Sequence, residues 1–312
     1  MPRVPYTRGL HPVAPDVWAW LAPDGGWGRS NAGLIAGPGS SLLVDTLFDL
    51  PQTREMLGQM AAVTTKRPLS AAVNTHGNGD HCFGNSLLPA DAPIYAAPAT
   101  AHRMHAESPE LLAQLVAAFP DSYAAKAFSA YEFEGIRLRD PDVTVTGETV
   151  VELGERRIRI VPVAPAHTEG DVIVHVPDVA TVFTGDLLFI EGAPIVWAGP
   201  IENWLGALDD ILALEPEVVV PGHGPVTDAD GIRDVQAYLR HVDSQAREAF
   251  RAGKTWREAA FGMDLDRFAK LRDSERVVIN THAVYRHLDP GLAAANVVEL
   301  FQAMGEWLEA RR

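Results

Sequence analysis

Asn74-Thr75-His76-Gly77-Asn78-Gly79-Asp80-His81 is the segment from which both the fold and the chemistry of this 312-residue chain can be inferred. It follows a short apolar run, residues 69–73, that predicts a buried strand. The two glycines break the strand, so the side chains at positions 76, 78, 80 and 81 can converge at its C-terminal end. Imidazole nitrogens combined with a carboxylate oxygen suit zinc, with iron or manganese as alternatives.

Three later segments have the same form, an apolar run followed by a ligand-type residue among small residues. Each predicted ligand stands just past the end of a strand, where the sites of αβ proteins collect. Two acidic residues near the second His, Glu169 and Asp171, are expected to hydrogen-bond to ligand imidazoles. The three segments are residues 158–163 before His167, residues 180–184 before Asp186, and residues 218–220 before His223.

This order of motifs resembles the metallo-β-lactamase superfamily, whose signature is His-x-His-x-Asp-His followed by a His, a Gly-Asp and a Gly-His-Gly. The resemblance spans about residues 15–227. It implies an α/β fold, the αββα sandwich, with a metal site at one edge of its two sheets. It also implies a first metal site with His76 and His167, a second with Asp80, His81 and His223, and Asp186 between them.

Asn78 stands where the family pattern has its second His. A neutral amide oxygen binds zinc more weakly than an imidazole nitrogen does. We therefore expect the second site to be filled firmly. The first site is expected to be weak, vacant, or occupied by a harder metal.

Composition restricts the classes of partner. The net charge is -15 and no basic stripe offsets it, which argues against a nucleic-acid ligand. Hydrophobic residues make up 47% of the chain, enough for one large core or a core with a smaller appendage. The single cysteine, Cys82, permits no intrachain disulfide, and we expect it to be a small buried residue.

Nothing in the sequence predicts a membrane segment, because no run of 18 apolar residues occurs. The N-terminal residues 1–5 lack the apolar core of a signal peptide. The expected location is therefore the cytoplasm, with no membrane partner.

The remaining pattern predicts one large αββα domain over residues 1–227 and a helical region over residues 228–312 packed on it. Within the first, residues 99–133 predict a helical insertion with many aromatic side chains. The C-terminal helices could also form a homodimer surface. Further elements are predicted as strands at residues 17–21 and 31–45 and as helices at residues 50–65, 109–118, 228–252, 255–261, 274–288 and 290–310.

Aromatic residues near the predicted ligands are candidates for a substrate pocket. Trp27 lies among glycines at a predicted hairpin tip, and Phe189 and Trp197 belong to an apolar loop after Asp186. Tyr123 belongs to the helical insertion, where the alternative is that it only packs the insertion onto the sandwich. His282 lies on a predicted helix, where the alternative is a hydrogen-bonded packed residue.

The predicted chemistry follows from the ligands. A metal ion with open coordination lowers the pKa of a water molecule and polarises a carbonyl oxygen. Asp80 and Asn78 are the predicted catalytic residues, with Asp80 both binding metal and orienting the water. Hydrolysis of an ester, thioester, lactone or amide is the natural reaction.

Short segments resemble the aromatic polyketide cyclase branch of the superfamily: residues 25–27, 30–33, 165–168, 214–220 and 275–277. That resemblance implies ring closure on a poly-β-keto intermediate and release from an acyl carrier protein by thioester hydrolysis. The substrate would then be apolar or aromatic. Two alternatives remain open: a general hydrolase of lactones, thioesters or β-lactams, and a non-catalytic member that binds a ligand.

Overall fold

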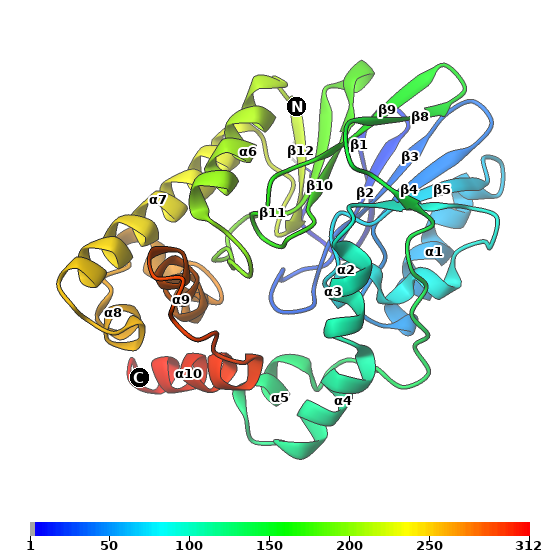
Figure 1. Cartoon of the computed structure of the whole chain (residues 1–312). Coiled ribbons are helices and arrows are strands. Elements are labelled where there is room, and N and C mark those ends of the chain that lie inside the picture. Colours follow the sequence, from blue (N-terminus) through cyan, green and yellow to red (C-terminus); the bar gives the residue numbers. More distant parts are fainter. Residues whose placement is uncertain (1–3) are drawn as a thin grey trace.

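Two β-sheets face each other at the centre of the molecule (Figure 1). The computed structural model describes residues 4–312, so residues 1–3 of the N-terminal segment considered above lie outside it. The first sheet has seven strands in sequence order, antiparallel from β1 to β4 and parallel from β4 to β7. Its strands are β1 (Gly9–Ala14), β2 (Val17–Leu21), β3 (Ala32–Ala36), β4 (Ser41–Val44), β5 (Leu69–Val73), β6 (Ile94–Ala96) and β7 (Val143–Thr144).

The second sheet has five strands in the order β12-β11-β10-β9-β8. Neighbouring strands in this sheet are antiparallel, except that β11 and β12 are parallel. Its strands are β8 (Thr149–Leu153), β9 (Arg156–Pro162), β10 (Val172–Val176), β11 (Thr181–Phe189) and β12 (Val218–His223).

Helices cover the outer faces of both sheets. In Figure 1, α1 lies on one side of the sheets and α7, α8 and α9 lie on the other, while α4, α5 and α10 gather at one end. The α-helices are α1 (Leu50–Thr64), α2 (Gly79–Cys82), α3 (Thr100–Ala106), α4 (Pro109–Ala118), α5 (Tyr123–Phe128), α6 (Ile201–Ala213), α7 (Ala229–Arg251), α8 (Trp256–Gly262), α9 (Val277–Leu288) and α10 (Val297–Glu309). Short 3-10 turns are η1 (Phe83–Leu87), η2 (Pro177–Val179), η3 (Asp266–Lys270) and η4 (Ser274–Arg276).

Three clusters of buried side chains correspond to the layers. The inner faces of the two sheets meet in one cluster, which joins Ile35 and Val73 to Ile160 and Val174. A second cluster packs α1 onto the outer face of the first sheet. The third packs α6, α7 and α9 onto the second sheet. Because both sheets are covered by helices, the architecture is the expected αββα sandwich.

The helical region after residue 227 shares its core with the sandwich. Leu187 of β11 and Trp204 of α6 belong to the same buried cluster as Val235 of α7 and Val278 of α9. The hydrophobic core therefore crosses the expected boundary at residue 227 without a break.

The last helix is shorter than its sequence pattern predicts. The expected helix over residues 290–310 begins only at Val297. Asn296 provides the reason, because its side chain accepts a hydrogen bond from the Glu299 backbone N–H and so caps the helix there. The residues before it form a turn, in which the Gly291 N–H donates to Asp289.

Among residues 4–312, the helices lack the combination of length and apolar character that crossing a bilayer requires.

Candidate metal centre

The predicted ligands come together at the edge of the sandwich where strands of both sheets end. His76 follows β5, and Asp80 and His81 lie in the short helix α2. His167 lies in the loop between β9 and β10, and His223 is the last residue of β12. Asp186 differs from its expected place: β11 continues to Phe189, so Asp186 lies inside the strand rather than after it.

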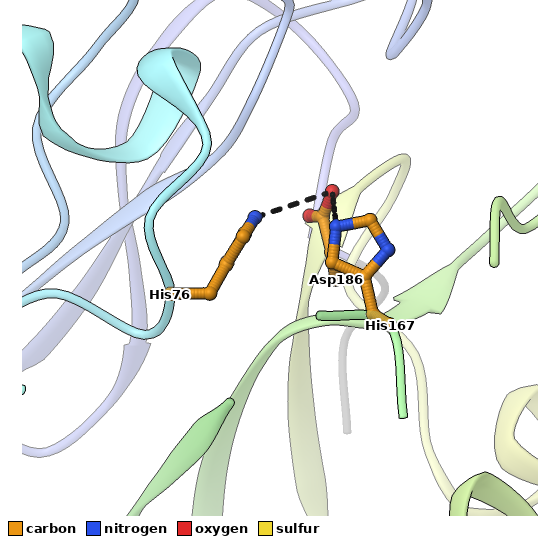
Figure 2. Close-up of side chains that lie close together, drawn as sticks. All are labelled: His76, His167 and Asp186. Atoms are coloured by element: carbon orange, nitrogen blue, oxygen red, sulfur yellow. Dashed lines mark ion pairs between the residues drawn. The ribbon is translucent and has the colours of Figure 1, made fainter. Parts of the chain in front are cut away.

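The first group consists of His76, His167 and Asp186 (Figure 2). The Nε2 atoms of His76 and His167 lie 3.8 Å and 3.4 Å from Asp186 Oδ2. All three residues are buried. Their ligand atoms lie within 4.8 Å of one another, close enough for one metal ion to contact all three.

The second group consists of Asp80, His81 and His223. His223 Nε2 lies 3.3 Å from Asp80 Oδ2, and His81 Nε2 lies 4.0 Å from the same oxygen. Asp186 is shared, because His81 Nε2 lies 3.1 Å from its Oδ1 and His223 Nε2 lies 3.4 Å from its Oδ2. The Asp186 carboxylate therefore stands between the two groups.

All four imidazoles present Nε2 to the centre because Nδ1 is occupied elsewhere. Nδ1–H donates to an oxygen in each case, which leaves the Nε2 lone pair free to bind a metal in the neutral ring. The acceptors are Thr75 Oγ1 for His76 at 3.1 Å, Asp45 Oδ2 for His81 at 2.9 Å, the Ile195 carbonyl for His167 at 2.7 Å and the Gly25 carbonyl for His223 at 3.2 Å.

These acceptors are not the ones expected from the sequence. Asp171 accepts hydrogen bonds from the Thr168 N–H and hydroxyl instead, and Glu169 is half exposed near Arg103. Asp45, which sequence reasoning missed, follows the apolar strand residues 41–44 as Asp186 was expected to follow its own strand. The same pattern of an apolar run and an acidic residue could have identified it.

Several buried polar atoms of the centre are left without a protein partner. His76 Nε2, His81 Nε2 and Asp186 Oδ1 make no hydrogen bond within residues 4–312. His81 Nε2 and Asp186 Oδ1 are near each other, but their geometry does not satisfy a hydrogen bond. Leaving buried polar groups unpaired costs about 1–3 kcal/mol each. The residues therefore fit a metal ion that would satisfy these atoms.

Burial and charge divide the imidazoles into two pairs. Burial lowers the pKa of His76 well below its ordinary value and lowers that of His167 to about 4. Burial also acts on His81 and His223, but carboxylates, Asp186 foremost, outweigh it in sum and raise the pKa of His81 well above its ordinary value and that of His223 to about 9. A metal ion must displace these protons, so its binding weakens at acid pH.

Asn78 faces both the centre and the helical insertion. Its Oδ1 lies 2.9 Å from His167 Nε2, and its Nδ2 donates to Glu107 Oε2 at 2.8 Å. Asn78 therefore lies beside the first group, with its amide oxygen directed toward His167.

A small apolar cavity of about 80 Å³ adjoins the centre. Asn78, Asp80 and His223 contribute to its floor. The predicted substrate residues Trp27, Phe189 and Trp197 line it. Phe128, one of the aromatic residues of the predicted insertion, also lines it. The lining residues that sequence reasoning missed come from distant elements and include Phe48, Glu107, Leu111, Leu112, Leu115, Arg276, Val297 and Phe301.

Two predicted substrate residues do not line this cavity. The Tyr123 hydroxyl hydrogen-bonds to Glu275 and accepts from Trp27 Nε1 at 2.9 Å. His282 is buried beside Trp256, and its Nε2 accepts from the Ala295 N–H. Tyr123 thus holds Trp27, which is half-buried and fixed rather than an exposed hairpin tip.

A larger hollow of about 1080 Å³ lies between the second sheet and η3 and α7. Its lining includes Glu217, Asp228 and Asp234 but none of the six candidate ligands. The small cavity is therefore the one positioned for chemistry at the centre.

Comparisons with known proteins agree with this geometry. The family model described as the metallo-beta-lactamase superfamily matches residues 25–223. The acyl-coenzyme A thioesterase MBLAC2 of Bos taurus is 26% identical over 212 residues, covering 62% of this chain and 73% of that protein. A hydroxyacylglutathione hydrolase of Synechococcus sp. is 30% identical over 149 residues, covering 47% of this chain and 45% of that protein.

Solved structures share the fold at low sequence identity. The sec-alkylsulfatase Pisa1 of Pseudomonas sp. superposes with a TM-score of 0.71 at 18% identity, covering 90% of this chain, which spans 50% of that protein. A metallo-beta-lactamase of Pontibacter korlensis gives a TM-score of 0.56 at 20% identity, with 75% of this chain and 99% of that one covered. With the family model matching more than half of its residues, the chain belongs to the metallo-β-lactamase superfamily and is a hydrolase of that fold.

Proposed function

We propose that this chain is a metal-dependent hydrolase that cleaves the thioester of a small apolar acyl group. The observation that carries the proposal is the apolar cavity that adjoins the two ligand groups. Its lining gives an acyl group a place to bind beside the centre. The thioesterase and the hydroxyacylglutathione hydrolase among the relatives support the same reaction class.

The side chains around the cavity have different roles in the proposed hydrolysis. A metal ion held there would polarise the acyl carbonyl and lower the pKa of a water molecule. Asp80 is the most accessible carboxylate of the two groups, with 13% of its side chain exposed, and it faces the cavity. We assign to it the orientation of the attacking water. Apolar side chains above it exclude other water from the acyl group.

We propose zinc for the second group, because two imidazoles and a carboxylate are a common zinc ligand set. The first group offers two imidazoles, the Asp186 carboxylate and the Asn78 amide oxygen. Because Asp186 is shared by both groups, the first differs from the second in offering a neutral amide oxygen where the second has the Asp80 carboxylate. We propose that the first group therefore holds zinc more weakly or takes a harder metal such as manganese or iron.

The test is hydrolysis of the butyryl thioester of N-acetylcysteamine by the full chain. We expect turnover that disappears after chelation, returns when zinc is added, and is lost in His223→Ala. His102→Ala, which changes an exposed imidazole outside the centre, should behave like the native protein. A folded, metal-loaded protein that leaves small acyl thioesters intact would overturn the proposal.

A second candidate is ring closure of an aromatic polyketide, which the aromatic lining of the cavity favours. Trp27, Phe128, Phe189 and Phe301 offer ring faces on which a planar intermediate could stack. The volume of about 80 Å³ opposes it, since pockets for drug-sized ligands measure about 300–1,000 Å³. A poly-β-keto thioester distinguishes the two: a cyclised product would support the second candidate, and the free linear acid would support the first.

A further inference from the structure

We propose that Glu107 is a positioning residue whose carboxylate turns the Asn78 amide so that the amide oxygen serves the first group as a metal ligand. The inference rests on the metal centre of the proposed function and not on its thioester substrate. It assigns a role at the centre to the helical insertion, since Glu107 directly follows α3.

The contacts around Asn78 are short and continuous. Asn78 is buried, with 8% of its surface exposed. Its Nδ2 donates to Glu107 Oε2 at 2.8 Å, and the other carboxylate oxygen lies 2.7 Å from Arg103 Nη2. Arg103 also lies over the Trp197 ring, with 5.3 Å to the ring centroid. The Glu107 carboxylate is therefore held from two sides.

With a neutral His167 ring, the contact between Asn78 and His167 is favourable only if a cation lies beside it. His167 Nδ1–H donates to the Ile195 carbonyl at 2.7 Å, so in the neutral ring Nε2 carries a lone pair and no proton. That lone pair faces Asn78 Oδ1 at 2.9 Å. Two acceptors at this distance repel each other unless a positive ion lies where both can reach it.

Glu107 decides which end of the amide faces His167. If the amide oxygen and nitrogen of Asn78 were exchanged, the oxygen would face the Glu107 carboxylate, and two acceptor oxygens would be opposed. The reverse orientation becomes favourable only when the carboxylate is removed. The Asn78 NH₂ group would then donate to His167 Nε2 and occupy two ligand atoms of the first group in a hydrogen bond.

Removal of Glu107 should therefore weaken one metal position and spare the other. Glu107→Gln should preserve the affinity of both metal positions, because a glutamine side-chain oxygen can still accept a hydrogen bond from Asn78. Partners that orient metal ligands typically change metal affinity by about 10- to 100-fold. Glu169 is the matched control: its carboxylate also lies near Arg103, at 3.8 Å, but more than half of its side chain is exposed and it makes no hydrogen bond to Asn78.

The experiment titrates cobalt(II) into metal-free full-length protein and follows visible absorption and heat. We expect the native protein to take up two equivalents of unequal affinity. Glu107→Leu and Glu107→Ser should weaken the lower-affinity event at least tenfold and leave the other unchanged, which also shows that the variants are folded. Glu107→Gln and Glu169→Leu should match the native protein.

The proposal is overturned if Glu107→Leu or Glu107→Ser takes up both equivalents with native affinity. It is equally overturned if Glu169→Leu loses as much as Glu107→Leu, or if the native protein takes up a single equivalent. The substrate question stays separate: the expected cobalt result without thioester cleavage would sustain Glu107 and reject the thioesterase.

Discussion

Gly222 shows how closely the backbone approaches the candidate ligands. A Cβ atom at this position would lie 1.9 Å from Asp186 Oδ1 and 2.7 Å from the Gly185 carbonyl carbon. Neither atom can move freely, because Asp186 lies inside β11. Gly222→Ala should therefore displace the shared carboxylate, with a loss of at least about 100-fold in thioester turnover expected for misplaced reacting groups.

Metal content and turnover of Gly222→Ala, measured together, check this prediction. Gly262→Ala is the control, because a Cβ there meets no atom within 4 Å. Turnover within a few-fold of native for Gly222→Ala would show that the Asp186 carboxylate does not need its present place.

Asp171 gives the protein a specific pH dependence of stability. Burial raises the pKa of this carboxyl to about 7, although hydrogen bonds from Thr168 oppose the change. The folded protein therefore keeps a proton that the unfolded chain releases near its ordinary pKa of about 3.9. The contribution of Asp171 to the free energy of unfolding is complete below pH ~4. It is lost as pH rises through about 7, by up to about 1.4 kcal/mol per pH unit.

Urea unfolding of the native protein and of Asp171→Asn at several pH values isolates this effect. The free energy of unfolding of the native protein, minus that of the variant, should fall between pH ~4 and ~7 and be constant above. A difference that rises with pH over this interval would mean that Asp171 is ionised in the folded protein.

At the scale of elements, α4 and α10 close the cavity. Leu111, Leu112 and Leu115 of α4 line it, opposite Val297 and Phe301. Each methylene transferred from water into such a space contributes about 0.8 kcal/mol, or about fourfold in kcat/KM. The gain should end after a few carbons, because the volume is only about 80 Å³.

Kinetics with acetyl to decanoyl thioesters would reveal this dependence. Leu112→Asn should reduce the increase of kcat/KM with acyl chain length. It should lower kcat/KM for the best substrate about tenfold, with metal content unchanged. Ala117→Asn, on an exposed position of the same helix, should leave the rise intact. A steady gain up to the longest chain would contradict the closed cavity.

Local signals in the sequence were enough to predict several elements. Pro51 and the apolar spacing predicted a helix over residues 50–65, and α1 spans Leu50–Thr64 with Asp49 as its cap. The helix expected over residues 109–118 has the bounds of α4. α10 was predicted to begin too early because Pro290 resembles a helix start, whereas Asn296 caps the helix.

Contacts between distant residues could not be predicted in this way. Glu107 reaches Asn78 across 29 positions, and the Trp27 indole reaches Tyr123 across 96. Such pairs depend on how the helical insertion folds over the sheet edge, and no local pattern encodes that. The metal ligands could be predicted because each is close to an apolar strand in the sequence. Most side chains that orient these ligands could not be predicted.

The whole molecule carries a net charge of -15, which should affect charged substrates. A coenzyme A thioester brings phosphate groups toward an acidic protein, whereas an N-acetylcysteamine thioester of the same acyl group is neutral. Raising the salt concentration from about 0.01 M to about 0.1 M shortens the Debye length from about 30 Å to about 10 Å. The kcat/KM for the coenzyme A thioester should therefore rise with salt, and that for the neutral thioester should stay level.

Steady-state rates for the two thioesters across this salt range provide the check. If kcat/KM for the coenzyme A thioester fell as salt increased, a local basic surface would have to bind the phosphates despite the net charge.

The metal content of the purified protein, reloaded with zinc and measured by elemental analysis beside Asn78→His, tests the centre most directly. The two groups of ligands share Asp186, and in the first group the amide of Asn78 replaces an imidazole. We therefore expect one firmly held zinc ion in the native chain and two in the variant. No zinc in the native chain, or two held equally firmly in both proteins, would contradict the account.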